Sequence, residues 1–249
     1  MSAAMEPRIQ YARTSDGVSI AYATAGRGRT VIDVPSPPLS HVQRQWDLLS
    51  DFHRGLAEGF RTIWYDSRGS GMSDRKATNF TMPAMLLDLE AVADRAGDDR
   101  FVLYGVYDGV SIAIAYAAKH PNRVSHLVLV DGRVEFTDYL ESPTISAEIA
   151  LRGQDWVLNT EALARVFSPF EESFAALFAE HVRAAVDQEA LQLAFAAQTE
   201  GAWNVSHLLD QIKIPRSSPF PAVRWLASAQ PSEAPDLGAA FRPGNCSSD

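Results

Sequence analysis

The chain has 249 residues, of which 46% are hydrophobic and 21% charged, so it can bury a sizeable core and is not disordered as a whole. A formal net charge of −9 argues against nucleic acid as a partner. The single cysteine, Cys246, cannot form an intrachain disulfide, and no stretch reaches the roughly 18 apolar residues of a membrane span. Because the first residues also lack the pattern of a secretory leader, we expect a cytoplasmic protein with no membrane partner.

The first half of the chain alternates strand and helix patterns. A β-hairpin is predicted where β-rich runs flank Ser15-Asp16-Gly17, and four short apolar runs follow that are typical of strands buried on both faces, at 30–34, 61–65, 100–104 and 125–130. Helices are predicted between them, over 43–59, from a proline-containing first turn at 81–83, and over 110–119. This alternation predicts a mostly parallel α/β sheet opened by an antiparallel hairpin.

The second half has a different pattern. Residues 133–204 show no strand signal and are rich in Ala, Leu, Glu and Phe, with amphipathic helices predicted over 167–180, beginning near 168–172, and over 182–198. Their position after the sheet favours a lid, and packing helices on the sheet are the alternative. Residues 207–215 resemble the lead-in to another strand, but the chain after them is rich in Ser, Pro and Ala. Each proline there lacks the N–H group that a strand would use to pair with its neighbour. We therefore predict a core at 1–132, a helical cap at 133–204 and an atypical, irregular tail at 205–249, with the sheet truncated at its C-terminal end.

Three motifs of the predicted core resemble the α/β-hydrolase superfamily: Asp66-x-Arg68-Gly69-x-Gly71-x-Ser73, Gly105-Val-Tyr-Asp-Gly109, and the helix that runs into His120-Pro121. The resemblance covers residues 8–215. It implies the α/β-hydrolase fold, a lid after the fourth parallel strand and chemistry on carboxylic esters or lactones. In the loop after the second parallel strand, we expect Arg68 to brace Asp66 and Asp74 by charge-assisted hydrogen bonds.

The second motif departs from the superfamily's G-x-S-x-G elbow. The resemblance implies that its central residue is the nucleophile, raised on a sharp strand-to-helix turn, and here that residue is Tyr107. A phenol is a better leaving group than an alkyl alcohol, so an aryl ester formed on it would not be a stable store of the acyl group. Tyr107 is thus a candidate nucleophile or, alternatively, a pocket-lining donor or plug. Asp108 lies one position beyond the register of an aspartate nucleophile, and we expect it to interact with the start of the following helix.

The other expected site residues are also altered. The superfamily places a histidine after the last strand, and none of the six histidines here follows a recognisable final strand. His41 and His207 are the candidate improvised bases, and a surface or capping role is the alternative for His41. Asp131 occupies an acid position known in relatives but has no histidine to orient. The resemblance also implies an oxyanion donor on the loop after residue 34, where Pro37 and Pro38 carry no N–H, unless the loop shifts to use Leu39 or Ser40.

Substrate-binding positions are predicted on this loop and at the elbow, at Ser36, Leu39, Ser40 and Asp108. No metal and no cofactor are predicted, because the chain lacks a Cys pair, a His-x-x-x-His motif and a Walker lysine motif. Two functions remain: an ester or lactone hydrolase with an altered catalytic site, or a catalytically silent module that binds an apolar small molecule or a protein partner. A truncated sheet would leave an exposed edge, through which we expect homo-oligomers to form.

Overall fold

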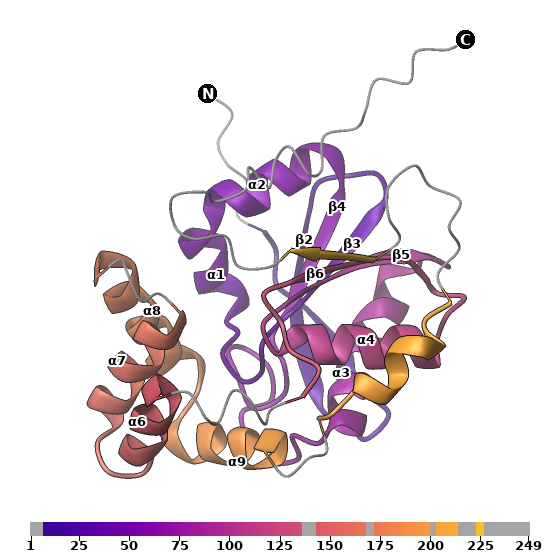
Figure 1. The fold of residues 1–249 in the computed structure, drawn as a ribbon. Helices are drawn as coiled ribbons and strands as arrows, with labels where there is room; N and C mark the ends of the chain where they lie inside the picture. The colour runs from indigo at the N-terminus through magenta and orange to yellow at the C-terminus, as the bar shows by residue number, and fades with distance from the viewer. Residues whose placement is uncertain (1–6, 136–142, 168–171, 200–202, 214–222, 227–249) are drawn as a thin grey trace, which may run out of the picture.

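The computed structural model of the protein describes residues 7–135, 143–167, 172–199, 203–213 and 223–226. Within these ranges one seven-stranded sheet forms the centre of the molecule, in the order β1-β2-β4-β3-β5-β6-β7 (Figure 1). The antiparallel members are β1 (Gln10–Arg13) and β2 (Ser19–Ala25), and the remaining strands pair in parallel. The predicted α/β-hydrolase type of sheet is confirmed.

The opening hairpin forms where the sequence predicts it. Gly17 has a φ of 91°, and its amide donates to the Thr14 carbonyl, which closes the turn. In the paired strands Arg13 lies opposite Ser19. A glycine is favoured at such a position because a residue with a Cβ rarely adopts positive φ.

Four predicted buried strands are present as β3 (Thr30–Val34), β4 (Arg61–Tyr65), β5 (Phe101–Val106) and β6 (Val124–Val130). The first two have the predicted bounds. The third extends two residues further than predicted because Gly105 and Val106 still pair with β6. That extension brings the end of β5 directly to Tyr107.

Helices cover both faces of the sheet. On one face lie α1 (Val42–Leu48) and α2 (Ser50–Gly59), and on the other lie α3 (Met82–Ala96) and α4 (Gly109–Lys119) (Figure 1). The single helix predicted over 43–59 is divided at Leu49, whose ψ of 34° departs from helical geometry. The largest hydrophobic core lies between the sheet and α3 and α4, and smaller clusters lie beneath α1 and α2.

In the described ranges four α-helices follow β6: α6 (Pro143–Leu151), α7 (Trp156–Phe167), α8 (Glu172–Ala185) and α9 (Gln188–Thr199). They contact the loops at the carboxyl ends of the strands, since the Gly71 amide donates to the Ala185 carbonyl and Arg75 to the carbonyl of Ala184. The predicted helix bounds are wrong, because Phe167 ends α7 and the break near 181 instead follows Ala185. There Asp187 accepts the Ala190 amide at 2.8 Å and starts α9. The predicted helix start at 168–171 lies outside the described residues.

The end of the chain differs from the irregular tail that we predicted. A short 3₁₀ helix, η1 (Ser206–Gln211), is followed by strand β7 (Val223–Leu226), which pairs in parallel with β6. The strand fits between Pro221 and Pro231, so the prolines that disfavour a long strand leave room for a short one. The described sheet has β1 and β7 at its edges, and association through an edge stays a prediction. Within the described ranges, no helix is long and apolar enough to cross a membrane.

Candidate functional site

The elbow between β5 and α4 is the backbone feature around which the candidate site is built. Tyr107 adopts a φ of 50°, and α4 begins two residues later. A Cβ on Gly105 would lie 2.9 Å from the Gly109 carbonyl oxygen, and one on Gly109 would lie 2.2 Å from the carbonyl oxygen of Val34. Only glycine fits at either position, so the two flanking glycines permit the sharp turn and hold Tyr107 at its tip.

The side chain of Tyr107 is partly buried where α7 packs against the elbow. Its ring makes an edge contact with Phe167, the last residue of α7, with 4.7 Å between ring centroids. Burial raises the pKa of the Tyr107 phenol above its usual value, as does the charge of Asp131, while Arg133 lowers it. The hydroxyl therefore stays protonated near neutral pH. In the described part of the chain, which includes all six histidines, no hydrogen bond joins an imidazole to this hydroxyl.

A cavity of about 340 Å³, which we call the elbow cavity, opens beside Tyr107. Its walls come from the ends of β3 and β5, the loop after β3, the α1–α2 junction, and α7 and α8. Aromatic and aliphatic side chains dominate the walls, with few polar groups among them. The lining residues are Asp33, Val34, Pro35, Ser36, Leu39, Ser40, Gln45, Leu48, Leu49, Phe52, Tyr104, Val106, Tyr107, Phe167, Phe174, Phe178 and His181.

Three predicted substrate-binding residues, Ser36, Leu39 and Ser40, line the elbow cavity, whereas Asp108 is not one of its lining residues. The Asp108 carboxylate accepts a hydrogen bond from the Ser36 hydroxyl at 3.0 Å and lies 3.7 Å from Arg133 Nε. Although Asp108 occupies the N-cap position of α4, its side chain makes no capping hydrogen bond. The predicted hydrogen-bonded capping of the helix start is therefore wrong, while a favourable interaction of the carboxylate with the helix dipole stays a prediction. The carboxylate instead links the elbow to the loop after β3 through its hydrogen bond with the Ser36 hydroxyl. On its other side it lies close to the guanidinium of Arg133.

The loop after β3 is held by hydrogen bonds to its carbonyl groups. Pro37 and Pro38 have no N–H, and the Leu39 amide donates to the Ser36 carbonyl at 2.9 Å. Gln198 donates to the Pro37 carbonyl, and His181 Nε2 lies 2.8 Å from the carbonyl oxygen of Leu39. The Leu39 amide, one of two alternatives for the missing oxyanion donor, is thus already used within the loop.

His181 is a site residue that the sequence did not reveal. It lies on α8 and lines the elbow cavity, and its ring stacks on Phe178. Since a carbonyl can only accept, His181 donates from Nε2, which leaves the buried Nδ1 without a hydrogen-bond partner in the described residues. Burial lowers the pKa of His181, although the bond to Leu39 raises it. An amphipathic helix pattern alone could not show that this histidine meets a loop 142 positions earlier.

The two histidines predicted as bases lie elsewhere. His41 is the buried N-cap residue of α1 and lines a second cavity of about 530 Å³, which His181 also lines, with 6.4 Å between the two ring centroids. Burial, with the nearby charges of His181, Arg44 and Arg75, lowers the pKa of His41 to about 4. His207 lies on η1 and lines neither cavity. Their roles as bases stay predictions, and the structure brings neither together with Tyr107 by a hydrogen bond among the described residues.

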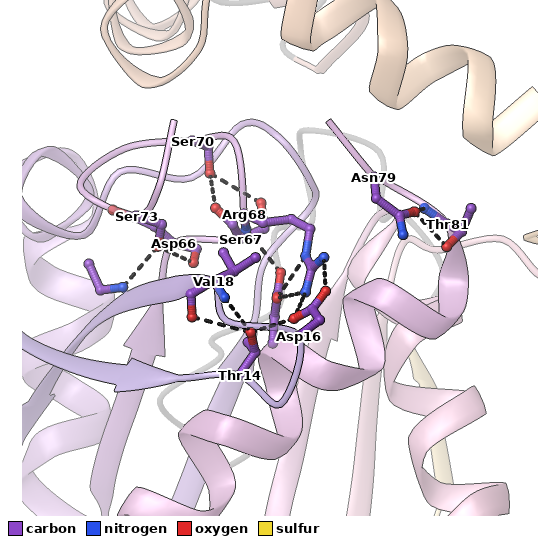
Figure 2. A network of polar contacts seen from close by, with 12 residues as sticks. Thr14, Asp16, Val18, Asp66, Ser67, Arg68, Ser70, Ser73, Asn79 and Thr81 are labelled. Atoms are coloured by element: carbon purple, nitrogen blue, oxygen red, sulfur yellow. Dashed lines mark hydrogen bonds and ion pairs between the residues drawn. The ribbon is translucent and has the colours of Figure 1, made fainter. Parts of the chain in front are cut away.

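The Asp66–Ser73 loop has a structural network, shown in Figure 2, with partners other than those predicted. Arg68 does not brace Asp66 or Asp74. Its guanidinium binds Asp16 of the hairpin at 2.7 Å and Asp88 of α3 at 2.8 Å. These partners come from distant parts of the chain, so local spacing could not identify them.

Asp66 is fully buried and accepts backbone amides at both carboxylate oxygens, from Val42 at 2.6 Å and from Met72 at 2.7 Å. Burial raises the pKa of Asp66 to about 7, although the two amides lower it. The Ser73 hydroxyl donates to the Asp66 carbonyl and accepts the Ala21 amide (Figure 2). The loop therefore joins β2, α1 and β4, and its Ser67 amide donates to the hydroxyl of Ser40 in the cavity wall. No cluster of three or more potential metal ligands occurs within the described ranges.

Comparisons with known proteins agree with this architecture. A family model described as alpha/beta hydrolase fold matches residues 40–213, more than half of the chain. The AB hydrolase superfamily protein YisY of Bacillus subtilis (strain 168) is 31% identical over 121 residues, which cover 48% of this chain and 44% of YisY. The chain thus spans less than half the length of this curated relative.

Two solved structures share the fold at lower sequence identity. Est816, described as an N-acyl homoserine lactone degrading enzyme, has a TM-score of 0.70 at 21% identity, covering 93% of this chain and 100% of Est816. A thermophilic esterase from Thermogutta terrifontis has a TM-score of 0.67 at 21% identity, covering 88% and 79% of the two chains. The sequence match over residues 40–213 and the shared architecture place this chain in the α/β-hydrolase fold family.

Proposed function

We propose that this protein is a catalytically silent member of its family that binds an apolar small molecule in the elbow cavity, with α6–α9 as the cap over the ligand. One observation carries the proposal: a partly buried phenol with a raised pKa stands at the tip of the elbow, in the place of an activated alcohol. The solved neighbours described as an esterase and as a lactone-degrading enzyme suggest the ligand class, a small ester, lactone or similar apolar compound.

The chemistry of Tyr107 supports binding over turnover. Nucleophilic attack needs an activated oxygen, and activation needs either a depressed pKa or an adjacent base. Burial raises the pKa of this phenol instead, and in the described residues no imidazole accepts its proton. The missing amides at Pro37 and Pro38 remove a further source of transition-state stabilisation, and one lost oxyanion donor typically costs about 10²–10³ in turnover.

The cavity itself supports a ligand-binding role. A volume of about 340 Å³ is within the range of small-molecule sites, which are typically about 300–1,000 Å³. Phe52, Phe167, Phe174 and Phe178 supply apolar wall area, and Ser36 offers a hydroxyl. Such a site has the composition of most ligand pockets, an apolar surface with a few polar groups.

A second candidate function is an active ester or lactone hydrolase with an altered site. The observation in its favour is His181, a neutral imidazole whose Nδ1 is unpartnered among the described residues, in the wall that also contains Tyr107. The lowered pKa of His181 keeps this nitrogen able to accept a proton at neutral pH.

One set of variants separates the two functions. Purified protein is assayed with p-nitrophenyl butyrate, and binding of the neutral fluorophore N-phenyl-1-naphthylamine is measured by its emission. We expect no turnover above buffer in the wild type or in Tyr107→Phe, with fluorophore binding in both. Tyr11→Phe, which alters a half-exposed tyrosine on β1, is the matched control.

The cavity is tested with Phe178→Ala, which should weaken fluorophore binding by at least about fivefold. An aromatic ring packed against a ligand contributes on the order of 1 kcal/mol or more to the free energy of binding. Leu177→Ala on the same helix is the control, because Leu177 is 55% exposed and lies outside the elbow cavity. Turnover that disappears in Tyr107→Phe would establish the hydrolase instead. Absence of fluorophore binding by the wild type would refute the binding proposal.

A further inference from the structure

A carboxylate lines the apolar elbow cavity. Asp33 is the fourth residue of β3, and strand alternation places it on the same face as Val31, toward α2. Its side chain is only 7% exposed, and it is one of the residues lining the elbow cavity. Among the described residues, the lining contains neither Lys nor Arg. A nearly buried charge in such a wall needs a partner, because desolvation of an unpaired carboxylate is costly.

In the part of the chain that the structure describes, Asp33 has a weak partner. Nε2 of His53, on α2, lies 3.6 Å from Asp33 Oδ2, beyond hydrogen-bond distance, and His53 is fully buried. Neither ring nitrogen of His53 has a hydrogen-bond partner within the described ranges, so His53 donates no hydrogen bond to Asp33. The pair therefore leaves carboxylate oxygens available to a donor or a cation that enters the cavity.

Aromatic rings surround the same space. Phe52 and Tyr104 lie next to each other near Asp33, with 5.3 Å between their ring centroids. Tyr107, Phe167 and Phe178 continue the wall, with successive centroids 4.7 Å and 5.4 Å apart. The faces of aromatic rings attract cations, most strongly where water is excluded, and quaternary ammonium groups are recognised in this way.

We infer that the elbow cavity binds small organic cations, an ammonium group carried on an apolar body, with Asp33 as the counter-charge and the aromatic rings as the wall. The inference rests on the proposed function, since it names the ligand class of that same cavity. The net charge of −9 acts in the same direction, because an acidic protein attracts cations over a longer range. Neutral esters of similar shape would use the apolar wall but leave Asp33 without its partner.

The test compares two probes of nearly equal shape, phenyltrimethylammonium and tert-butylbenzene, which differ by a nitrogen cation in place of a carbon. Each is titrated against the complex of the full chain with N-phenyl-1-naphthylamine, and displacement is followed by fluorescence. We expect the cation to compete at least about tenfold more strongly in the wild type, and the two probes to compete equally in Asp33→Asn. Asp51→Asn changes the net charge equally at an exposed position on α2 and should keep the preference.

A circular dichroism melt checks that Asp33→Asn is folded. If it is not, Phe52→Leu replaces it, because loss of one ring beside Tyr104 should reduce the cation preference several-fold while tert-butylbenzene still competes. Equal competition by both probes in the wild type, or a preference that persists in Asp33→Asn, would overturn the inference and leave the apolar binding function intact. Failure of the fluorophore to bind the wild type would overturn both.

Discussion

Replacing Gly109 with alanine tests whether the elbow depends on close backbone contact. The added Cβ would lie 2.2 Å from the Val34 carbonyl oxygen and 2.9 Å from that of Pro35. Carbon and oxygen atoms normally approach to about 3.3 Å, so one segment must move by about 1 Å. No flexible side chain can give way, since both obstacles are main-chain atoms at the end of β3, a strand paired on both sides.

Overpacking of a core typically costs about 1–3 kcal/mol. Because this clash is with a central strand, we expect Gly109→Ala to lower the free energy of unfolding by about 3 kcal/mol. Gly55→Ala is the matched control, because a Cβ at position 55 of α2 meets nothing within 4 Å. There alanine should raise the free energy of unfolding by about 0.5–1 kcal/mol through its higher helix propensity.

Both variants are measured by urea denaturation, followed by circular dichroism and tryptophan fluorescence, and compared at equal m values. The free energies of unfolding of the two variants should thus differ by about 4 kcal/mol, with Gly109→Ala below the wild type and Gly55→Ala above it. A Gly109→Ala protein as stable as the wild type, with an unchanged m value, would refute the close approach of α4 to β3 on which the elbow geometry rests.

Two further predictions concern buried carboxylates. Asp88→Asn should lower the free energy of unfolding by about 3–5 kcal/mol in urea, because it leaves the buried Arg68 without a full partner, whereas Asp94→Asn at an exposed ion pair should change it by at most about 1 kcal/mol. Equal effects of the two would contradict the buried pair. Asp66 binds its proton more tightly in the folded than in the unfolded state, since its pKa is raised to about 7, so its contribution to stability is present below about pH 4 and lost as the pH rises through 7. As the pH rises from 5 to 7.5, the free energy of unfolding measured in urea should therefore fall less steeply in Asp66→Asn than in the wild type. Parallel curves for the two proteins would show that Asp66 does not contribute to this pH dependence.

Much of the core was predictable from local patterns. The Asp16-Gly17 turn, the short apolar runs of β3 and β4 and the glycines around Tyr107 each express a constraint that acts within a few residues. Turn chemistry, burial on both faces and close backbone approach can be recognised without knowing which segments become neighbours. The family and the altered elbow follow from the same local evidence.

Contacts between distant segments could only be decided by the fold. The partners of Arg68 come from the hairpin and α3, His181 reaches the Leu39 carbonyl from α8, and β7 pairs with β6 in a region whose prolines predict no regular structure. Asp33 looked like an ordinary member of a buried strand, and its place in the cavity wall depends on where α2 and α8 pack. Hydrophobic periodicity determines which residues are buried, whereas the partner of a buried polar group depends on the packing of segments that are far apart in the chain.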